Sequence, residues 1–308
     1  MSHTFDFACS AFLGALGQRI ARIVTCRSWL ATMNPHPAPS TSIKELFASL
    51  WRNRALIIQL SKREVNLRYR GSFMGLAWSF FNPLLMLLVY TFMFTVIFKS
   101  RWVVVGEENT GNFTILLFIG IIIHGIFAEC VGRAPLLILN NANYVKKVVF
   151  PLEILPWVAL CSTLFHSGVS VLMLLAAQLL LGHTIALTAA FFPMIVLPLL
   201  LITMGFAWFL AATGVYLRDV SQTVGLFTTI LLFLSPVFYP RSALPGPFQK
   251  WLSLSPITFA LEEGRKALIF GQRPDVGGWV IYLLVSLLVA WMGFWWFQKS
   301  RKGFADVL

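Results

Sequence analysis

The chain has 308 residues, of which 58% are hydrophobic and only 12% are charged, and its mean hydropathy is +0.78. In soluble domains about a quarter of the residues are charged, so this composition excludes a soluble protein and indicates an integral membrane protein. The net charge of +12 comes from bases that flank apolar runs, which argues against a nucleic-acid-binding surface. The four cysteines have neither a CxxC pair nor a metal-ligand spacing, and we expect no disulfide, metal or cofactor.

Residues 1–41 differ from the rest of the chain. Their apolar stretch 7–17 has no base before it, so it lacks the charged start of a signal peptide. The run NPHPAP at 34–39 is typical of a disordered linker. Two interpretations stay open, namely a disordered N-terminal extension and a translation start at Met33.

Folded structure is expected from Ser42 onward. The run SIKE at 42–45 fits a capping box, and apolar residues then recur at the spacing of one helical face. A second box, SKRE at 61–64, predicts the start of another helix. We expect residues 42–70 to form cytoplasmic interface helices that lie at the membrane surface. Their bases either only set the topology or also present a docking face to a cytoplasmic partner.

Six apolar runs follow, and the length of each is close to or above the roughly 20 residues that a helix needs to cross a bilayer. Their apolar residues are continuous rather than alternating, which favours helices over barrel strands. The sequence therefore predicts an all-α membrane protein with one six-helix domain over residues 71–308. The predicted spans are residues 73–98, 113–131, 154–181, 185–213, 222–239 and 277–297.

The distribution of basic residues predicts the orientation. With six spans, 17 of the 24 Lys and Arg fall on the side that holds both termini, and 7 fall on the other side. The positive-inside rule then puts both termini of this multi-pass protein in the cytoplasm. In the first span, Asn82-Pro83 is unusual for a lipid-facing helix, so we expect these two residues to face protein or a cavity.

The loops carry two further predictions. The inner segment 133–153 is polar and interrupted by proline, yet it has apolar residues at helical spacing, which predicts a short amphipathic helix. The outer segment 241–275 is semi-apolar and interrupted by Pro and Gly, which predicts two short helices that dip back toward the bilayer.

No enzyme motif is present in the sequence. A GxxxxGK[ST] phosphate loop, an HExxH motif and a GxSxG elbow are all missing, so we expect no catalytic and no metal-binding residue. His124, Glu129 and His166 are the ionisable exceptions inside the spans. We interpret both histidines as structural hydrogen-bonding residues rather than as a proton relay.

Three blocks resemble the membrane subunit of type-2 ABC exporters, in the branch that exports O-antigen, capsular polysaccharide and teichoic acid. The blocks are REVNLRYRGSFMGLAWSFFNPLLMLLVYTFMFTVIF, NANYVKKVVFPLEILP and GVYLRDVSQTVGLFTTILLFLSPVFYP. They occur in order, are correctly placed against the predicted spans, and extend the similarity over about residues 43–301. The resemblance implies a permease homodimer in the bacterial inner membrane, driven by two separate ATPase subunits. Its substrate would be a glycan linked to polyprenyl pyrophosphate.

The resemblance also implies roles for individual residues, including gate helices within 241–275. Spans one and five would line the sugar path with Trp78, Phe81, Asn82, Tyr90, Phe233, Phe238 and Tyr239. The bases that would attract the pyrophosphate are Lys62, Arg63, Arg68 and Arg70. The helix that couples to the ATPase would contain Asn141, Asn143, Tyr144, Lys146 and Lys147.

Three alternatives remain at this level. A type-2 exporter of drugs or small lipids would have the same fold. A membrane transferase acting on polyprenyl-linked sugars would need a cluster of acids or a His–Asp pair at one membrane face, and the sequence offers neither. A purely structural subunit fits poorly with the prolines and glycines that interrupt the spans.

Overall fold

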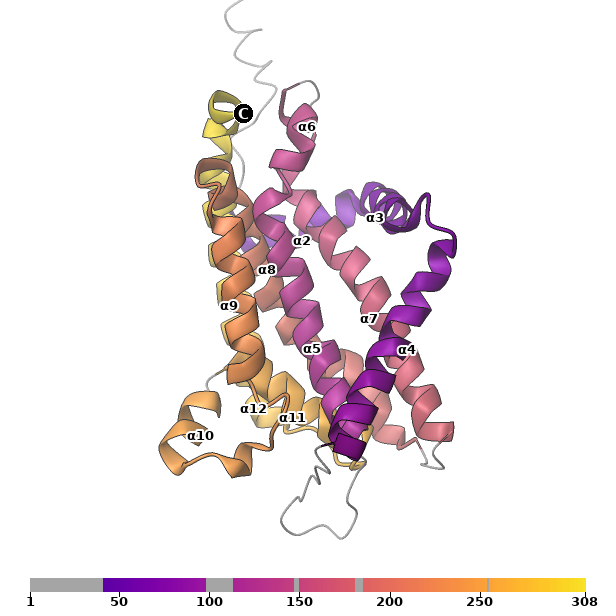
Figure 1. The fold of residues 1–308 in the computed structure, drawn as a ribbon. Helices are drawn as coiled ribbons and strands as arrows, with labels where there is room; N and C mark the ends of the chain where they lie inside the picture. The colour runs from indigo at the N-terminus through magenta and orange to yellow at the C-terminus, as the bar shows by residue number, and fades with distance from the viewer. Residues whose placement is uncertain (1–40, 98–112, 147–149, 181–184, 254) are drawn as a thin grey trace, which may run out of the picture. The chain divides into compact units, whose positions relative to one another are not determined.

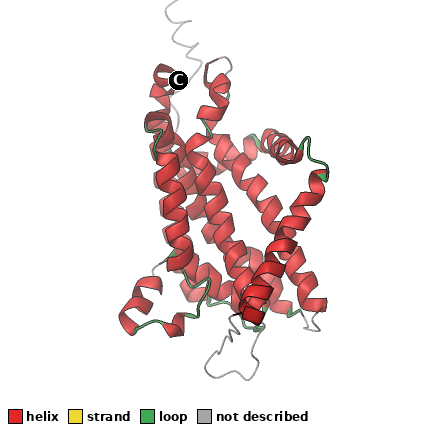
Figure 2. Ribbon diagram, in the orientation of Figure 1, coloured by secondary structure: helices red, strands yellow, loops and turns green. Residues whose placement is uncertain are grey.

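The computed structural model describes residues 41–97, 113–146, 150–180, 185–253 and 255–308. Contacts group Thr41–Leu308 into one compact unit. Within the described ranges the regular structure is helical and contains no strand (Figure 1, Figure 2). The all-α class is therefore confirmed for these residues, whereas the expectations for the N-terminal extension lie outside them.

The first helix, α2, comprises Ile43–Arg52 and begins where the sequence predicts. The hydroxyl of Ser42 accepts a hydrogen bond from the backbone amide of Lys44 (3.3 Å) and so caps the helix. Glu45, the other residue of the expected capping box, pairs with Arg52 (2.8 Å) in the last turn of the helix.

The second helix, α3, comprises Arg54–Tyr69 and begins earlier than the sequence predicts. The predicted helix start at Ser61 is wrong, because Ser61 lies in the middle of α3. Its hydroxyl donates to the carbonyl of Ile57 (2.8 Å) in the preceding turn and lies 3.4 Å from the carbonyl of Val158. A serine that bonds back within its own helix has the same sequence pattern as a cap but a different role.

Within the described residues, five helical stretches are long and apolar enough to cross a membrane, and the sixth predicted span forms a shorter helix. The five stretches are Gly75–Phe94, Phe113–Leu136, Leu152–Leu180, Leu187–Tyr216 and Val276–Gly303. Their α-helices are α4 (Trp78–Thr91), α5 (Phe113–Arg133), α7 (Leu155–Leu180), α8 (Phe192–Tyr216) and α12 (Val276–Ser300). The sixth, α9 (Val220–Leu234), has 15 residues.

Helix α9 ends early because a proline follows it. The residue before a proline is pushed toward extended backbone, and Ser235, just before Pro236, has φ −75° and ψ 150°. The apolar run continues to Tyr239, but the helix does not. The segment after Leu234 is nevertheless buried, with Val237 fully inaccessible.

Helices α5 and α8 form the centre of the bundle, and α4 lies at its edge (Figure 1). In both α5 and α8, 72% of the apolar window is buried, against 6% in α4. Helix α8 packs closely on α12 because glycines face each other there: a Cβ added to Gly205 would lie 2.5 Å from the carbonyl oxygen of Val289. Aromatic rings fill the adjoining core, with Trp208 5.2 Å from Phe294 between ring centroids.

The C-terminal end of the chain is held against the segment that follows α6 (Ala142–Lys146). Arg301 forms an ion pair with Glu153 (2.8 Å) and donates to the carbonyl of Phe150 (3.1 Å). Phe304, the first residue of α13 (Phe304–Val307), is fully buried. A largely buried ion pair and an aromatic anchor thus fix the last residues to the bundle.

Two short helices, α10 (Gly246–Ser253) and α11 (Pro256–Leu268), occur between α9 and α12, where the sequence predicts a pair. That they dip back toward the bilayer stays a prediction. Most residues of α11 are buried against α5 and α8. The remaining elements are a π-helix that continues α4, η2 (Phe92–Ile97), and short 3₁₀ helices. The latter are η1 (Gly75–Ala77), η3 (Ala134–Leu136), η4 (Leu139–Asn141), η5 (Leu152–Ile154), η6 (Leu187–Phe191), η7 (Arg241–Ala243) and η8 (Arg301–Gly303).

Candidate functional site

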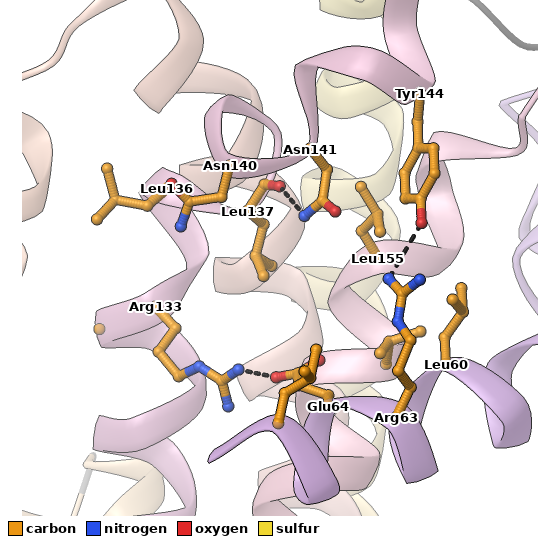
Figure 3. Close-up of a pocket in the computed structure, with 13 residues that line it drawn as sticks. Leu60, Arg63, Glu64, Arg133, Leu136, Leu137, Asn140, Asn141, Tyr144 and Leu155 are labelled. Carbon is orange, nitrogen blue, oxygen red and sulfur yellow. Dashed lines mark hydrogen bonds and ion pairs between the residues drawn. The ribbon is translucent and has the colours of Figure 1, made fainter. Parts of the chain in front are cut away.

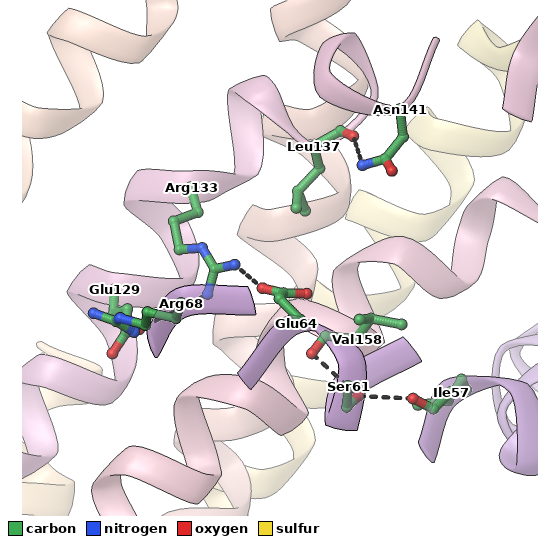
Figure 4. Close-up of polar contacts among 9 residues, drawn as sticks. All are labelled: Ile57, Ser61, Glu64, Arg68, Glu129, Arg133, Leu137, Asn141 and Val158. Atoms are coloured by element: carbon green, nitrogen blue, oxygen red, sulfur yellow. Dashed lines mark hydrogen bonds and ion pairs between the residues drawn. The ribbon is translucent and has the colours of Figure 1, made fainter. Parts of the chain in front are cut away.

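An ion-pair cluster joins α3 to the C-terminal end of α5 (Figure 4). Arg68 pairs with Glu129 and Glu64 pairs with Arg133, while Arg133 Nη1 also lies 3.8 Å from Glu129 Oε1. The four side chains are between 24% and 49% exposed, so solvent weakens each pair. Two acids balance two bases, and the cluster therefore holds α3 in place rather than presenting a net positive charge.

Arg63 points from α3 in another direction and donates to the hydroxyl of Tyr144 (3.1 Å). The two residues line a cavity of about 380 Å³ between α3 and the chain that leads from α5 to α7 (Figure 3). Of the four predicted pyrophosphate-attracting bases, Arg63 and Arg68 are thus engaged with other residues of the chain. All four side chains are exposed, and the described residues offer Lys62 and Arg70 no ion pair or side-chain hydrogen bond.

The predicted coupling residues lie around η4 and α6. Asn141 donates its side-chain amide to the carbonyl of Leu137 (2.8 Å), so it stabilises its own turn. The ring of Tyr144 stacks on Phe150, with centroids 4.4 Å apart and planes 15° apart, and Asn143 is exposed. The predicted short helix exists, although α6 has only five residues. Lys147 and the side chain of Lys146 lie outside the described part of the structure.

Three predicted path residues meet at the C-terminal end of α9. Phe233 and Phe238 stack with centroids 5.6 Å apart, and Phe238 also stacks on Phe94 of η2 at 6.2 Å. The hydroxyl of Tyr239 donates to the carbonyls of Phe233 (3.1 Å) and Leu234 (2.8 Å).

The other four predicted path residues lie on α4. The described contacts do not join them to the aromatic residues at the C-terminal end of α9. Trp78 and Tyr90 are partly buried, whereas Phe81 is 41% exposed and Asn82 is exposed. The expectation that Asn82 faces protein or a cavity is therefore not met within the single chain, because α4 has few neighbours there. A facing protein surface would have to come from another chain.

Both histidines inside the spans have hydrogen-bond partners, as their structural interpretation requires. His124 Nε2 donates to the carbonyl of Thr228 (3.1 Å) and links α5 to α9. His166 Nδ1 shares a hydrogen bond with the hydroxyl of Tyr69 (3.2 Å), which links α7 to the end of α3. Burial raises the pKa of the Tyr69 phenol, so this group stays neutral.

Sequence reasoning missed several of these partners. Phe94 had no distinguishing signal among the phenylalanines of the first span. Glu129 and Arg133 did carry a sequence signal, because they stand four residues apart at the end of an apolar run, where a helical ion pair is expected. Their partners on α3 lie more than 60 residues away in the sequence, and no local spacing rule connects the two.

The fold and these sites define a polytopic helical membrane protein whose polar contacts gather at the ends of its spans. Residues 55–269 match the family model described as ABC-2 type transporter, and the chain belongs to this family. It is 30% identical over 264 residues to the O-antigen export system permease protein RfbA of Myxococcus xanthus, covering 85% of this chain and 98% of that protein. An O-antigen export system permease protein RfbA of Klebsiella pneumoniae is 22% identical over 254 residues, or 82% of this chain and 95% of the relative.

Proposed function

We propose that the chain is the permease subunit of an ATP-driven exporter in the bacterial inner membrane. It moves a polysaccharide of the O-antigen or capsule type, linked to polyprenyl pyrophosphate, from the cytoplasm to the outer face. One observation carries this proposal: the similarity to O-antigen export permeases extends over nearly the whole of the relatives and 82–85% of this chain.

In this proposal two copies of the chain form the path. Helix α4 is almost unburied in the single chain, and on α9 Phe233 is 64% exposed. Exposed aromatic and polar residues on two different spans are better explained by a second copy than by lipid alone. Helix α9 is the sixth crossing: its 15 residues extend about 22 Å, and the buried segment 235–237 completes the span.

The aromatic residues suit a polymer of sugars. An aromatic face stacks on the apolar face of a sugar ring without requiring one particular stereochemistry, so successive sugars can slide past. The stacked pair of Phe233 and Phe238, with Tyr239 beside it, would form the outer part of such a path. Trp78, Phe81, Asn82 and Tyr90 of α4 would line the rest from the dimer interface.

The charged end of the substrate would be attracted at α3. Pyrophosphate is best held by several Lys or Arg side chains. All four predicted bases are exposed, and among the described residues Lys62 and Arg70 are the two that form no ion pair or side-chain hydrogen bond. Arg63 and Arg68 would contribute only after releasing Tyr144 and Glu129. Their primary role in this proposal is to keep α3 docked.

Energy would come from two separate ATPase subunits that bind around α6. The segment after α6 is tied to several spans at once: Glu153 pairs with Arg301 of the C-terminal end, and its carbonyl accepts from Trp208 of α8 (3.0 Å). A displacement of α6 would therefore reach α7, α8 and α12 together. This movement would separate the α4 and α9 faces of the two copies.

Deletion of the gene tests the proposal. We expect surface polysaccharide to be lost and lipid-linked polymer of normal composition to accumulate inside the cells, with recovery on complementation. Affinity purification from the same cells should recover an ATPase with a phosphate loop. Unchanged surface polysaccharide together with no internal polymer would refute the proposal.

The same experiment separates the alternatives. A transferase acting on polyprenyl-linked sugars would change the composition of the glycan rather than its location. An exporter of drugs or small lipids would leave the glycan untouched and change drug sensitivity or membrane lipid content instead. The amount and composition of the glycan are therefore measured both at the cell surface and inside the cells.

A further inference from the structure

A buried arginine lies in the segment between α9 and α12. Arg265 belongs to α11 and is only 5% exposed. Its Nε donates to the carbonyl of Leu116 on α5 (3.0 Å), its Nη1 to the carbonyl of Pro236 (2.7 Å), and its Nη2 to the carbonyl of Val237 (2.9 Å). One side chain thus joins α11, the start of α5 and the chain that leaves α9.

The two carbonyls beyond α9 have a specific need for such a donor. Pro236 ends the helix, so the carbonyls that follow lie outside its hydrogen-bond ladder, yet Ser235 and Val237 are 2% and 0% exposed. Buried backbone groups without a partner are strongly destabilising. The planar guanidinium presents several N–H groups in fixed directions and reaches both carbonyls at once, which a lysine ammonium does not reproduce.

The residues held in this way lead directly into the proposed path. Phe238 follows Val237 and stacks on both Phe233 and Phe94. A second tie follows closely, because Arg241 Nη1 lies 3.4 Å from Glu262 Oε2, one helical turn before Arg265 on α11. The chain after α9 is therefore fastened to α11 on both sides of Phe238.

We infer that Arg265 is a positioning residue that clamps residues 236–237 to α11 and α5 and so sets the place of Phe238 at the outer end of the path. The clamp consists of contacts within the chain, whereas its effect on export rests on the proposed function. Arg265 does not touch the substrate in this role. Loosening the clamp releases the chain after α9 locally and leaves the rest of the bundle intact.

Two glycines of α5 provide a matched pair of variants. A Cβ at Gly120 would lie 3.0 Å from Arg265 Nη2 and 3.1 Å from Val237 Cγ1, whereas a Cβ at Gly125 would meet nothing within 4 Å. Gly120→Ala therefore presses on the clamp while Arg265 is retained, and Gly125→Ala is its control. Arg265→Lys is the second perturbing variant, because it keeps the charge but loses the fork of donors.

The experiment uses full-length protein in lipid nanodiscs, with the four native cysteines replaced by alanine and Ser235→Cys as the reporter. The rate of reaction with a fluorescent maleimide measures how often this buried position opens. We expect Gly120→Ala and Arg265→Lys each to raise the rate about tenfold, the factor that corresponds to about 1.4 kcal/mol. Gly125→Ala should leave it unchanged. A second reporter, Ser162→Cys on α7, where Ser162 is 1% exposed, should stay unreactive throughout.

Two results would overturn the inference: an unchanged rate at position 235 in both perturbing variants, or an equal rise at position 162, which would mean a general loosening. The measurement needs neither an ATPase nor a glycan, so it is independent of the proposed function. Export by the same variants is then measured in cells that lack the native gene. Faster labelling with normal export would leave the clamp established and would contradict the role of Phe238 in the path.

Discussion

Arg68 and Arg70 stand two residues apart, yet their surroundings differ. Both are exposed, but Arg68 pairs with Glu129, whereas Arg70, where α3 ends, has no ion-pair partner among the described residues. If exposed charge that is not already paired attracts the pyrophosphate, the double substitution Lys62→Glu and Arg70→Glu should lower the export rate about tenfold or more, because a local field acts mainly on encounter. Surface glycan measured over time in complemented deletion cells tests this prediction.

Arg68→Glu serves as the contrasting variant. It places a second carboxylate beside Glu129, so we expect a loss of about 1 kcal/mol of stability, as is typical for partly exposed pairs. Adding Glu129→Arg should restore the pair but only part of the stability, because the new arginine lies one helical turn from Arg133. Normal export by a correctly inserted protein that carries both Lys62→Glu and Arg70→Glu would show that these bases only set the topology.

At the scale of elements, the pairing of α8 with α12 depends on backbone contact. A Cβ at Gly293 would overlap the carbonyl oxygen of Gly205 on the facing helix, and this backbone atom cannot move aside alone. We expect Gly293→Ala to lower the stability of the purified protein by about 1–3 kcal/mol, the range for an overpacked core. Thermal unfolding in detergent is the measurement.

Gly225 of α9 is the matched control for this prediction. A Cβ there would meet nothing within 4 Å. Gly225→Ala should be neutral or should stabilise the protein by up to about 1 kcal/mol, the difference in helix propensity between the two residues. Equal unfolding temperatures for the two alanine variants would mean that α8 and α12 do not need close approach.

The helices themselves were largely predictable, because an apolar run of sufficient length has one stable structure in lipid. The errors came from signals that are only a few residues long. The pattern at Ser61 resembles a helix start but lies inside α3, and Pro236 ends α9 before its apolar run is complete. The contacts of Arg265 were not predictable, since its partners at Leu116 and Pro236 are 149 and 29 residues away.

At the scale of the whole molecule, two groups of polar ties lie apart from the ion-pair cluster between α3 and α5. Around α6, the pair of Glu153 with Arg301 fastens the segment that follows α6 to the C-terminal end of the chain. Beyond α9, Arg265 fastens the chain to α11 and α5. Helix α4 takes little part in the packing and is 6% buried in its apolar window. A permease that opens between α4 and α9 of two copies would therefore move its least restrained surfaces while both groups of ties persist.

The arrangement of the chain ends makes a prediction about topology. Trp291, in the C-terminal half of α12, donates its indole N–H to the carbonyl of Thr41 (3.0 Å), so the chain before α2 lies beside the part of α12 that leads to Arg301. Both ends of the described chain therefore lie on one side of the bundle. Two ends on one side require an even number of crossings, and five long helices alone do not satisfy this requirement. We therefore predict that α9 crosses as well, despite its 15 residues.

Fusions to alkaline phosphatase and to green fluorescent protein test this topology. Phosphatase joined after Pro240 should be active, and phosphatase joined after Leu217 or Leu308 should be inactive, because the enzyme requires the oxidising periplasm for its disulfides. Fluorescent protein joined after Leu308 should fluoresce. If α9 did not cross, phosphatase joined after Pro240 would be inactive and phosphatase joined after Leu308 would be active. The chain ends would then face opposite sides of the membrane, which the hydrogen bond between Trp291 and Thr41 does not allow.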